Sequence, residues 1–183
     1  MNIWFERAAS KHKEAIFSWL NEPHMKEFWD NSPEHREDIE IFMEGRHTPS
    51  NYFKGMNSYW IGLIKDEPYC LVMTHEENEA ADPPEAYKPH LSKKGKTIGL
   101  DFGIGNRAFV GKRLAAETLI SFMNFFTKNI DPLVDTYIID PNTNNPRAIH
   151  VYQKAGFQIV GEYMQESGYF DQKKSLVMVK RCS

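Results

Sequence analysis

The sequence has few cysteines and no long apolar run. Only Cys70 and Cys182 occur among 183 residues, a number and spacing that indicate neither a disulfide framework nor a metal site. No stretch approaches the roughly 18 apolar residues that a membrane helix needs, and charge appears at Glu6 and Arg7 before any apolar signal core forms. These absences predict a cytoplasmic chain with no metal and no membrane contact.

The charge balance is slightly acidic. Lysine and arginine number 22 against 25 aspartates and glutamates, giving a net charge of −3, which argues against nucleic acid as the main partner. The hydrophobic fraction of 41% and the charged fraction of 26% are typical of a soluble globular protein. One domain of this length can bury about 70% of its unfolded surface. We expect a single domain over residues 1–183, as a monomer or a homodimer.

Hydrophobic periodicity and turn signals divide the chain into alternating helices and strands. In the first half we expect a strand over 3–7, a helix capped by Ser10, a helical turn near 25–29, a helix from Ser32-Pro33 through Glu44, and a hairpin of strands 59–64 and 69–75. In the second half we expect strands 97–104 and 136–140 around a helix over 111–129, then a helix over 145–155 and strands 158–164 and 175–180. This order predicts a mixed α/β sheet with a central parallel βαβ unit.

Two features of the middle of the chain suggest a binding function. Three glycines, Gly99, Gly103 and Gly105, interrupt a strand, which often marks close approach by another backbone or a ligand. A glycine and two cations, Gly111, Lys112 and Arg113, precede an apolar helix, and the free amides of a helix start with nearby cations suit a pyrophosphate. The same glycine is also what an ordinary turn requires.

The segment after the strand ending at Asp140 carries a more specific pattern. Asn145 is followed by Ala148, Tyr152 and Gly156-Phe157, and this spacing resembles the C-terminal signature of the GNAT superfamily of acyltransferases. The resemblance implies a mixed, mostly antiparallel sheet with helices on both faces. It also implies acetyl-CoA as cosubstrate and an amine as acceptor. Direct transfer is favoured because neither cysteine lies in a recognisable nucleophile setting.

Within that superfamily, the chain resembles the aminoglycoside 6′-N-acetyltransferases. The stretch 19–29, Gly99-Leu100-Asp101 and Asp140-Pro141 carry this similarity, and the small-molecule amine would then be polycationic. Siderophore-pathway hydroxylamine acetyltransferases share the N-terminal pattern but have histidine where this chain has Asp101. Acetylation of a hydroxylamine or of a protein N-terminus therefore stays an alternative.

The resemblance assigns roles to individual residues. Asp101 would accept the proton of the amine and Tyr152 would protonate the coenzyme A thiolate, because amine acetylation needs a base and an acid. Asp140 would hold substrate amino groups, and Trp29 is a further candidate substrate contact. Apart from the resemblance, the charge of the acidic loop with Glu77, Glu79 and Asp82 suggests that it attracts a polycation. The residues implied in cofactor binding are Phe102, Gly103, Ile104, Val110, Gly111, Lys112, Arg113, Leu114, Ala115, Asn145 and Ala148.

The chain departs from the family pattern in two places. Val110 and Arg113 occupy positions of the phosphate loop where the family has Gln or Arg and Gly, which leaves a non-catalytic acyl-CoA-binding sensor as an alternative. The acidic loop also lacks the tryptophans found in relatives, so the identity of the amine acceptor stays open.

Overall fold

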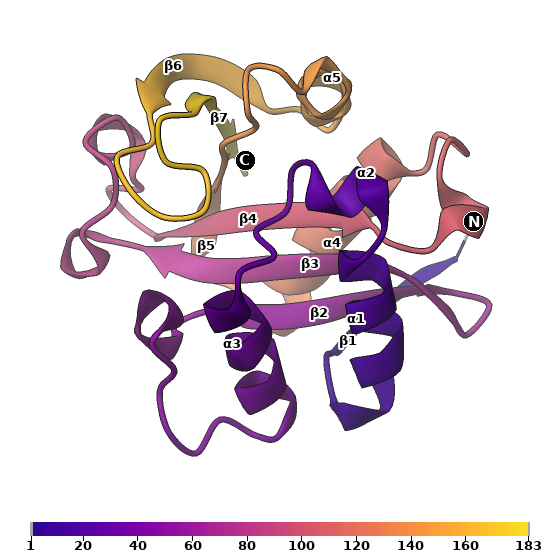
Figure 1. Ribbon diagram of the computed structural model, residues 1–183. Coiled ribbons are helices and arrows are strands. Elements are labelled where there is room, and N and C mark those ends of the chain that lie inside the picture. Colours follow the sequence, from indigo (N-terminus) through magenta and orange to yellow (C-terminus); the bar gives the residue numbers. More distant parts are fainter. Residues whose placement is uncertain (1, 183) are drawn as a thin grey trace. The chain divides into compact units, whose positions relative to one another are not determined.

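The computed structural model describes residues 2–182 and contains seven strands (Figure 1). The strand order is β1-β2-β3-β4-β5-β7-β6. Strands β4 and β5 run parallel, whereas the pairs β1–β2, β2–β3, β5–β7 and β6–β7 are antiparallel. The predicted mostly antiparallel sheet with a central parallel pair is confirmed. The chain forms two compact units, residues 2–74 with 101–114 and residues 75–100 with 115–182.

The first unit combines three helices with the first strands. Its elements are β1 (Ile3–Arg7), α1 (Lys13–Leu20), α2 (Pro23–Lys26), α3 (Pro33–Met43), β2 (Ser58–Ile64), most of β3 (Glu67–Glu77) and the end of β4 (Lys96–Ile104). Figure 1 shows α1 and α3 in front of β2, whereas Met25 of α2 lies against Gly103 at the end of β4. Ile16, Leu20 and Phe42 from the helices form one apolar cluster with Ile61 and Leu71 from the strands. The apolar faces predicted for α1 and α3 are therefore the ones that pack.

The two predicted helix caps in this unit have different outcomes. Ser32 caps α3 as expected, because its Oγ accepts a hydrogen bond from the backbone N–H of His35 at 3.3 Å. The cap expected at Ser10 is wrong. Residues Ser10–His12 form a 3-10 turn before α1, and the ring Nδ1 of His12 accepts from the backbone N–H of Ala9 at 3.1 Å.

The predicted β-hairpin is confirmed, with a longer second strand. Lys65 and Asp66 form its turn with φ values of 51° and 64°, the left-handed backbone that two-residue hairpin turns require. Strand β3 then continues to Glu77 rather than ending at residue 75. The first residues of the predicted acidic loop are thus part of a strand.

The second unit packs one long helix on the parallel strands. Its elements are α4 (Ala115–Asn129), β5 (Val134–Ile139), α5 (Pro146–Lys154), β6 (Gln158–Met164) and β7 (Lys174–Arg181), with the ends of β3 and β4. Leu119, Phe122 and Phe126 of α4 are buried. The hydroxyl of Tyr137 in β5 donates to the carbonyl oxygen of Met123 at 3.1 Å. The predicted βαβ unit is this β4–α4–β5 segment.

Helix α4 begins four residues later than predicted. Gly111 and Arg113 have φ values of 76° and 61°, and a right-handed helix cannot pass through left-handed residues. Leu114, expected on the face of the helix, precedes it. Its side chain packs in the first unit with Tyr69 and Cys70.

The polar, proline-rich stretch between β3 and β4 contains two short 3-10 helices, Glu79–Ala81 and Lys88–His90. Tyr87 anchors the segment, because it is 5% exposed and packs with Val177 and Val179. Among the described residues, no helix is long and apolar enough to cross a membrane.

Candidate active site

Side chains of the protein itself lie against the glycines of β4. A Cβ at Gly99 would lie 2.6 Å from Nε2 of His75, and one at Gly103 would lie 2.7 Å from Sδ of Met25. A Cβ at Gly105 would collide with the ring of Trp19. The glycines therefore mark close packing by side chains of the protein, and the approach of a ligand to this strand stays a prediction.

Asp101 lies in β4, within the first unit, and is half-buried. Burial raises the pKa of Tyr52, and the negative charges of Asp30 and then Asp101 raise it further. Asp101 is thus within electrostatic reach of the Tyr52 phenol. Trp29, the other predicted substrate contact in this unit, is 6% exposed, and its ring would lie 3.4 Å from a Cβ at Gly103.

The predicted phosphate-binding residues form a loop rather than a helix start. Gly111 and Arg113 have left-handed backbones, and such turns can direct successive amides into an anion-binding concavity. The side chains of Lys112 and Arg113 are exposed, and a Cβ at Gly111 would meet nothing within 4 Å. An open backbone beside two cations fits a diphosphate.

Phe102 and Ile104, also predicted to bind cofactor, pack against the apolar cluster that includes Leu114.

Asp140 follows β5 in the second unit and accepts several hydrogen bonds. The Tyr163 hydroxyl donates to its Oδ2 at 2.6 Å, and Nε2 of Gln165 lies 3.4 Å from the same oxygen. The Tyr87 hydroxyl donates to this carboxylate as well. Burial raises the pKa of Asp140 to about 6, although the hydrogen bonds from Tyr163 and Tyr87 act in the opposite direction. Asp140 is therefore a positioned carboxylate that titrates near neutrality.

Glu77 lies near Asp140 and not in an exposed loop. It is the last residue of β3, is 7% exposed, and its Oε1 lies 2.7 Å from Nε2 of His75. The charge of Glu77 raises the pKa of Asp140, whereas that of His75 lowers it. Glu79 and Asp82, by contrast, are exposed, so only one of the three predicted acidic residues joins this cluster.

Helix α5 carries the signature residues of the second unit. Oδ1 of Asn145 accepts from the backbone N–H of Ala148 at 3.1 Å, which makes Asn145 the cap of the helix. Tyr152 is 7% exposed and its ring centroid lies 6.2 Å from that of Phe157. Ala115 is the first residue of α4. Asp101 and Tyr152 belong to different units.

Several side chains around the predicted site residues were not predicted from the sequence. They are His75, Tyr87, Tyr163 and Gln165 in the second unit, and Asp30 and Tyr52 in the first. Strand alternation was the available signal, because residues i and i+2 share a face of a strand. His75 and Glu77 have that spacing within β3, whereas Gln165 lies just after the end of β6, two residues beyond Tyr163. No local pattern indicated Tyr87, which lies in the acidic, proline-rich stretch.

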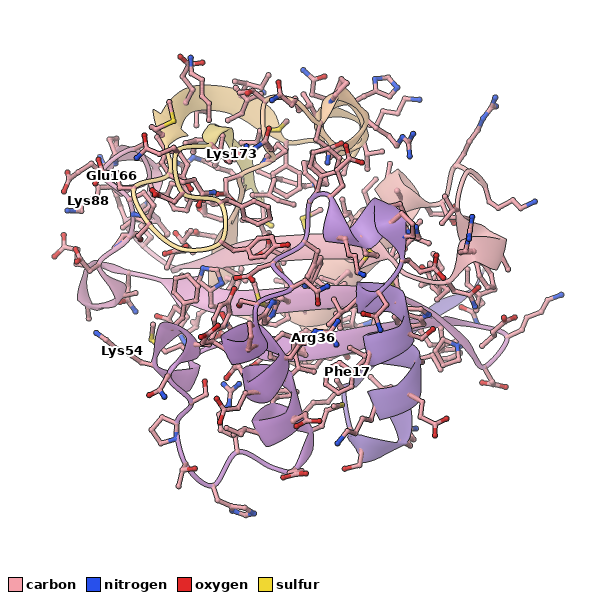
Figure 2. All side chains as sticks on the ribbon, in the orientation of Figure 1. Phe17, Arg36, Lys54, Lys88, Glu166 and Lys173 are labelled. Carbon is pink, nitrogen blue, oxygen red and sulfur yellow. The ribbon has the colours of Figure 1, made fainter. Side chains whose placement is uncertain are left out.

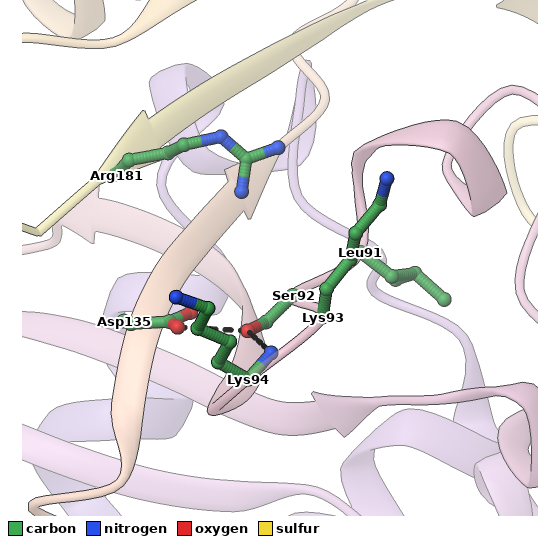
Figure 3. Close-up of a pocket in the computed structure, with 6 residues that line it drawn as sticks. All are labelled: Leu91, Ser92, Lys93, Lys94, Asp135 and Arg181. Carbon is green, nitrogen blue, oxygen red and sulfur yellow. Dashed lines mark hydrogen bonds between the residues drawn. The ribbon is translucent and has the colours of Figure 1, made fainter.

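A pocket of about 340 Å³ lies elsewhere in the second unit (Figure 3). Its carboxylate, Asp135, is engaged, because Oδ2 accepts from Oγ of Ser92 at 2.8 Å and Oδ1 accepts from Oγ1 of Thr136 at 2.8 Å. The other lining residues are Leu91, Lys93, Lys94 and Arg181. None of the predicted site residues lines this pocket.

The fold and the α5 signature define an acetyltransferase of the GNAT class. The acetyltransferase (GNAT) domain family matches residues 8–164, and the chain belongs to this family. An aminoglycoside N(6′)-acetyltransferase type 1 from Klebsiella pneumoniae is 26% identical over 155 residues, which cover 84% of this chain and 72% of that protein. This membership confirms the predicted N-acetyltransferase activity and acetyl-CoA as the acyl donor.

Solved structures show the same fold at lower identity. The aminoglycoside N(6′)-acetyltransferase of Legionella pneumophila has a TM-score of 0.69 at 22% identity, covering 98% of this chain and 92% of that one. A structure of AAC(6′)-Ib in complex with paromomycin and acetyl-CoA has a TM-score of 0.73 at 20% identity, covering 99% and 94%. At these identities the likeness establishes the fold.

Proposed function

We propose that the enzyme acetylates a primary amine of a small polycationic molecule, and that an aminoglycoside 6′-amine is the acceptor. The observation that carries this proposal is the half-buried carboxylate of Asp140, held by the hydroxyls of Tyr163 and Tyr87 beside Glu77. A fixed carboxylate in a polar shell is suited to hold an ammonium group of a substrate. The curated relative described above, an aminoglycoside N(6′)-acetyltransferase, supports the same acceptor class.

In this proposal, Asp101 prepares the nucleophile. A protonated amine has no lone pair, so a base must take its proton before or while its nitrogen attacks the thioester carbonyl carbon. The half-buried Asp101 carboxylate accepts that proton. The nitrogen–carbon bond then forms as the carbon–sulfur bond breaks.

Tyr152 completes the proton balance. The departing thiolate takes the phenolic proton of Tyr152. The attacking nitrogen loses its second proton as the amide forms, and this proton replaces the one lost by the phenol, while the proton accepted by Asp101 returns to solvent. The position of Tyr152 in α5, seven residues after the cap Asn145, matches the position of the family's general acid. Its low exposure of 7% keeps the phenol out of bulk water, which favours transfer to one acceptor atom.

The loop 110–114 is proposed to hold the diphosphate of the donor. Lys112 and Arg113 supply positive charge, and the left-handed backbones of Gly111 and Arg113 expose amides to an anion. Glu79 and Asp82 remain exposed carboxylates that raise the local concentration of a polycation.

A thiol-release assay across an amine panel tests the proposal. We expect acetyl-CoA turnover with kanamycin-type aminoglycosides and none with N-hydroxylysine or short peptides. Turnover with N-hydroxylysine alone would instead place the enzyme with the hydroxylamine acetyltransferases. Calorimetric binding of acetyl-CoA without transfer to any amine would identify a non-catalytic sensor.

A further inference from the structure

An aromatic stack in the first unit runs from the core to an exposed ring. The His35 ring lies between those of Trp29 and Tyr52, with centroid distances of 6.1 and 4.5 Å and interplanar angles of 11° in both pairs. The Phe53 ring meets Tyr52 edge-on at 4.7 Å. Phe53 is 64% exposed, whereas Trp29 and His35 are 6% and 1% exposed. A large ring is therefore presented to solvent on a buried aromatic support.

A buried ion pair fixes the loop that carries Phe53. Asp38 of α3 is fully buried, and its Oδ1 accepts from Nη2 of Arg46 at 2.7 Å. The same guanidinium donates to the carbonyl oxygens of Gly55 and Asn57, just after Phe53 in the chain. These bonds hold the backbone that directly follows Phe53 without the help of a ligand.

The negative charges of two carboxylates, Asp30 and Asp101, act on the Tyr52 phenol. Its hydroxyl donates to Oδ2 of Asp30 at 2.8 Å. Burial and the charges of Asp30 and Asp101 raise the pKa of Tyr52 above its usual value, so the phenol remains a neutral donor. Lys54, which follows Phe53, projects away from the ribbon (Figure 2). The charges of Asp30 and Asp101 therefore favour a cation near the Tyr52 phenol.

Two buried polar atoms of the stack lack a hydrogen-bond partner within residues 2–182, namely Nε1 of Trp29 and Nε2 of His35. Nδ1 of His35 donates to the carbonyl oxygen of Asp30 at 2.7 Å, and burial lowers the pKa of the ring. The ring is thus neutral, with Nε2 as an acceptor. Because both atoms are buried, they are not open to a ligand that binds at the exposed Phe53 ring.

We infer that Tyr52, Phe53 and Asp30 form an acceptor-binding surface for a ring that carries a protonated amine. The inference rests on the proposed function and adds side chains that the family signature does not contain. The exposed Phe53 ring offers its face to the apolar face of the ligand ring and to its ammonium. Asp30 and Asp101 supply the opposite charge. An amino sugar combines these two features.

Calorimetric titration of the full chain with kanamycin, and separately with acetyl-CoA, tests the inference. Phe53→Ala should weaken kanamycin binding about tenfold, a typical loss for a cation–aromatic contact together with its apolar area, and leave acetyl-CoA binding unchanged. Phe53→Trp should restore it. Phenylalanine, alanine and tryptophan all carry a Cβ, so the left-handed backbone at position 53 (φ 42°) is strained to the same degree in the natural chain and in both variants. Trp4→Ala, which removes another exposed ring of the same unit (59% exposed), should leave both affinities unchanged.

The outcomes separate this inference from the proposed function. Unchanged kanamycin binding in Phe53→Ala, or no kanamycin binding by the natural chain, overturns the inference whatever the turnover. A loss confined to Phe53→Ala, in a natural chain that binds kanamycin but releases no thiol with it, supports the binding surface and overturns the proposed acceptor. An equal loss in Trp4→Ala would make the effect non-specific and overturn the inference as well.

Discussion

The hydroxyl of Tyr163 donates a hydrogen bond of 2.6 Å to the carboxylate of Asp140, although the two residues are 23 positions apart in the chain. This contact holds one carboxylate oxygen in place. Burial nevertheless raises the pKa of Asp140 to about 6, so the charge state of the proposed ammonium contact depends on pH near neutrality.

The first prediction concerns that pH dependence. Kanamycin affinity should rise as pH increases through about 6, because only ionised Asp140 attracts an ammonium. Asp140→Asn should bind kanamycin about 10-fold to 100-fold more weakly at pH 7.5, the range expected for loss of a charge-assisted hydrogen bond. It should also lose the pH dependence in this window. Calorimetry between pH 5 and pH 7.5 measures both, with the exposed turn substitution Asp66→Asn as control.

The same shift has an opposite consequence for stability. The pKa of Asp140 is raised in the folded state from an ordinary value of 3.8, so the folded chain binds more protons than the unfolded chain between about pH 4 and pH 6. This stabilisation is complete below that window and is lost as pH rises through it. Relative to Asp140→Asn, the free energy of unfolding of the natural chain should therefore fall as pH rises from about 4 to about 6, which urea unfolding of both proteins measures. A constant difference between the two would contradict the assignment.

A second prediction follows from the packing of His75 over Gly99. In Gly99→Ala the new Cβ would lie 2.6 Å from Nε2 of His75 and 3.1 Å from Oε1 of Glu77, which should lower the free energy of unfolding by about 1–3 kcal/mol. Adding His75→Ala should recover most of that loss, as a double-mutant cycle would show. Gly161→Ala, where a Cβ meets nothing within 4 Å, should be neutral.

The third prediction assigns the general acid. Tyr152→Phe should lower kcat about 10²-fold or more, the usual contribution of a positioned proton donor, with little change in the KM for acetyl-CoA. Steady-state kinetics with the best amine of the panel measures both constants. Tyr169→Phe removes a phenol that is 49% exposed and should have no effect. If Tyr152→Phe and the natural enzyme had the same kcat, Tyr152 would not be the general acid.

The fourth prediction assigns the base. Asp101→Asn should reduce kcat/KM for the amine by about 10²-fold and shift its pH profile toward higher pH, where more of the amine is already neutral. The binding of acetyl-CoA should be unaffected, which calorimetry can verify. If the variant kept the natural pH profile, proton acceptance would have to be assigned to another group.

The fifth prediction concerns the support of the Phe53 loop. Asp38→Ala leaves Arg46 and Tyr59 without their buried partner and should cost about 3–5 kcal/mol, because an uncompensated buried charge remains. Glu37→Gln, on the exposed side of the same helix, should change stability by less than about 0.5 kcal/mol. Chemical denaturation of the two variants makes the comparison.

Most of the secondary structure could be predicted because its signals are local. Two examples are the buried face of α1, which follows from the spacing of Ile16, Trp19 and Leu20, and the helix cap at Ser32. Each depends on a few adjacent residues, and the structure confirms both. The start of α4 could not be predicted well. The left-handed backbones of Gly111 and Arg113 interrupt an apparently helical pattern, and only glycine signals such a position in sequence.

The candidate site was only partly accessible from the sequence. Asp101, Asp140 and Tyr152 stand out as chemical groups in a recognisable pattern, and their roles remain proposals. The shell around Asp140 did not stand out, since Tyr87 and Tyr163 come from segments far from residue 140 in the chain. Likewise, the sequence predicts that Glu77 lies in an acidic loop, whereas the structure includes it in β3.

The amino-acid sequence by itself determined the class of this protein, because the α5 signature and the alternation of strands and helices depend on short-range spacing. Tertiary structure alone decided which residues accompany Asp140, why β4 needs its glycines, and where the aromatic stack ends at Phe53. The physical reason is that burial, desolvation and hydrogen bonding act through space. They join residues whose separation along the chain carries no periodic signal.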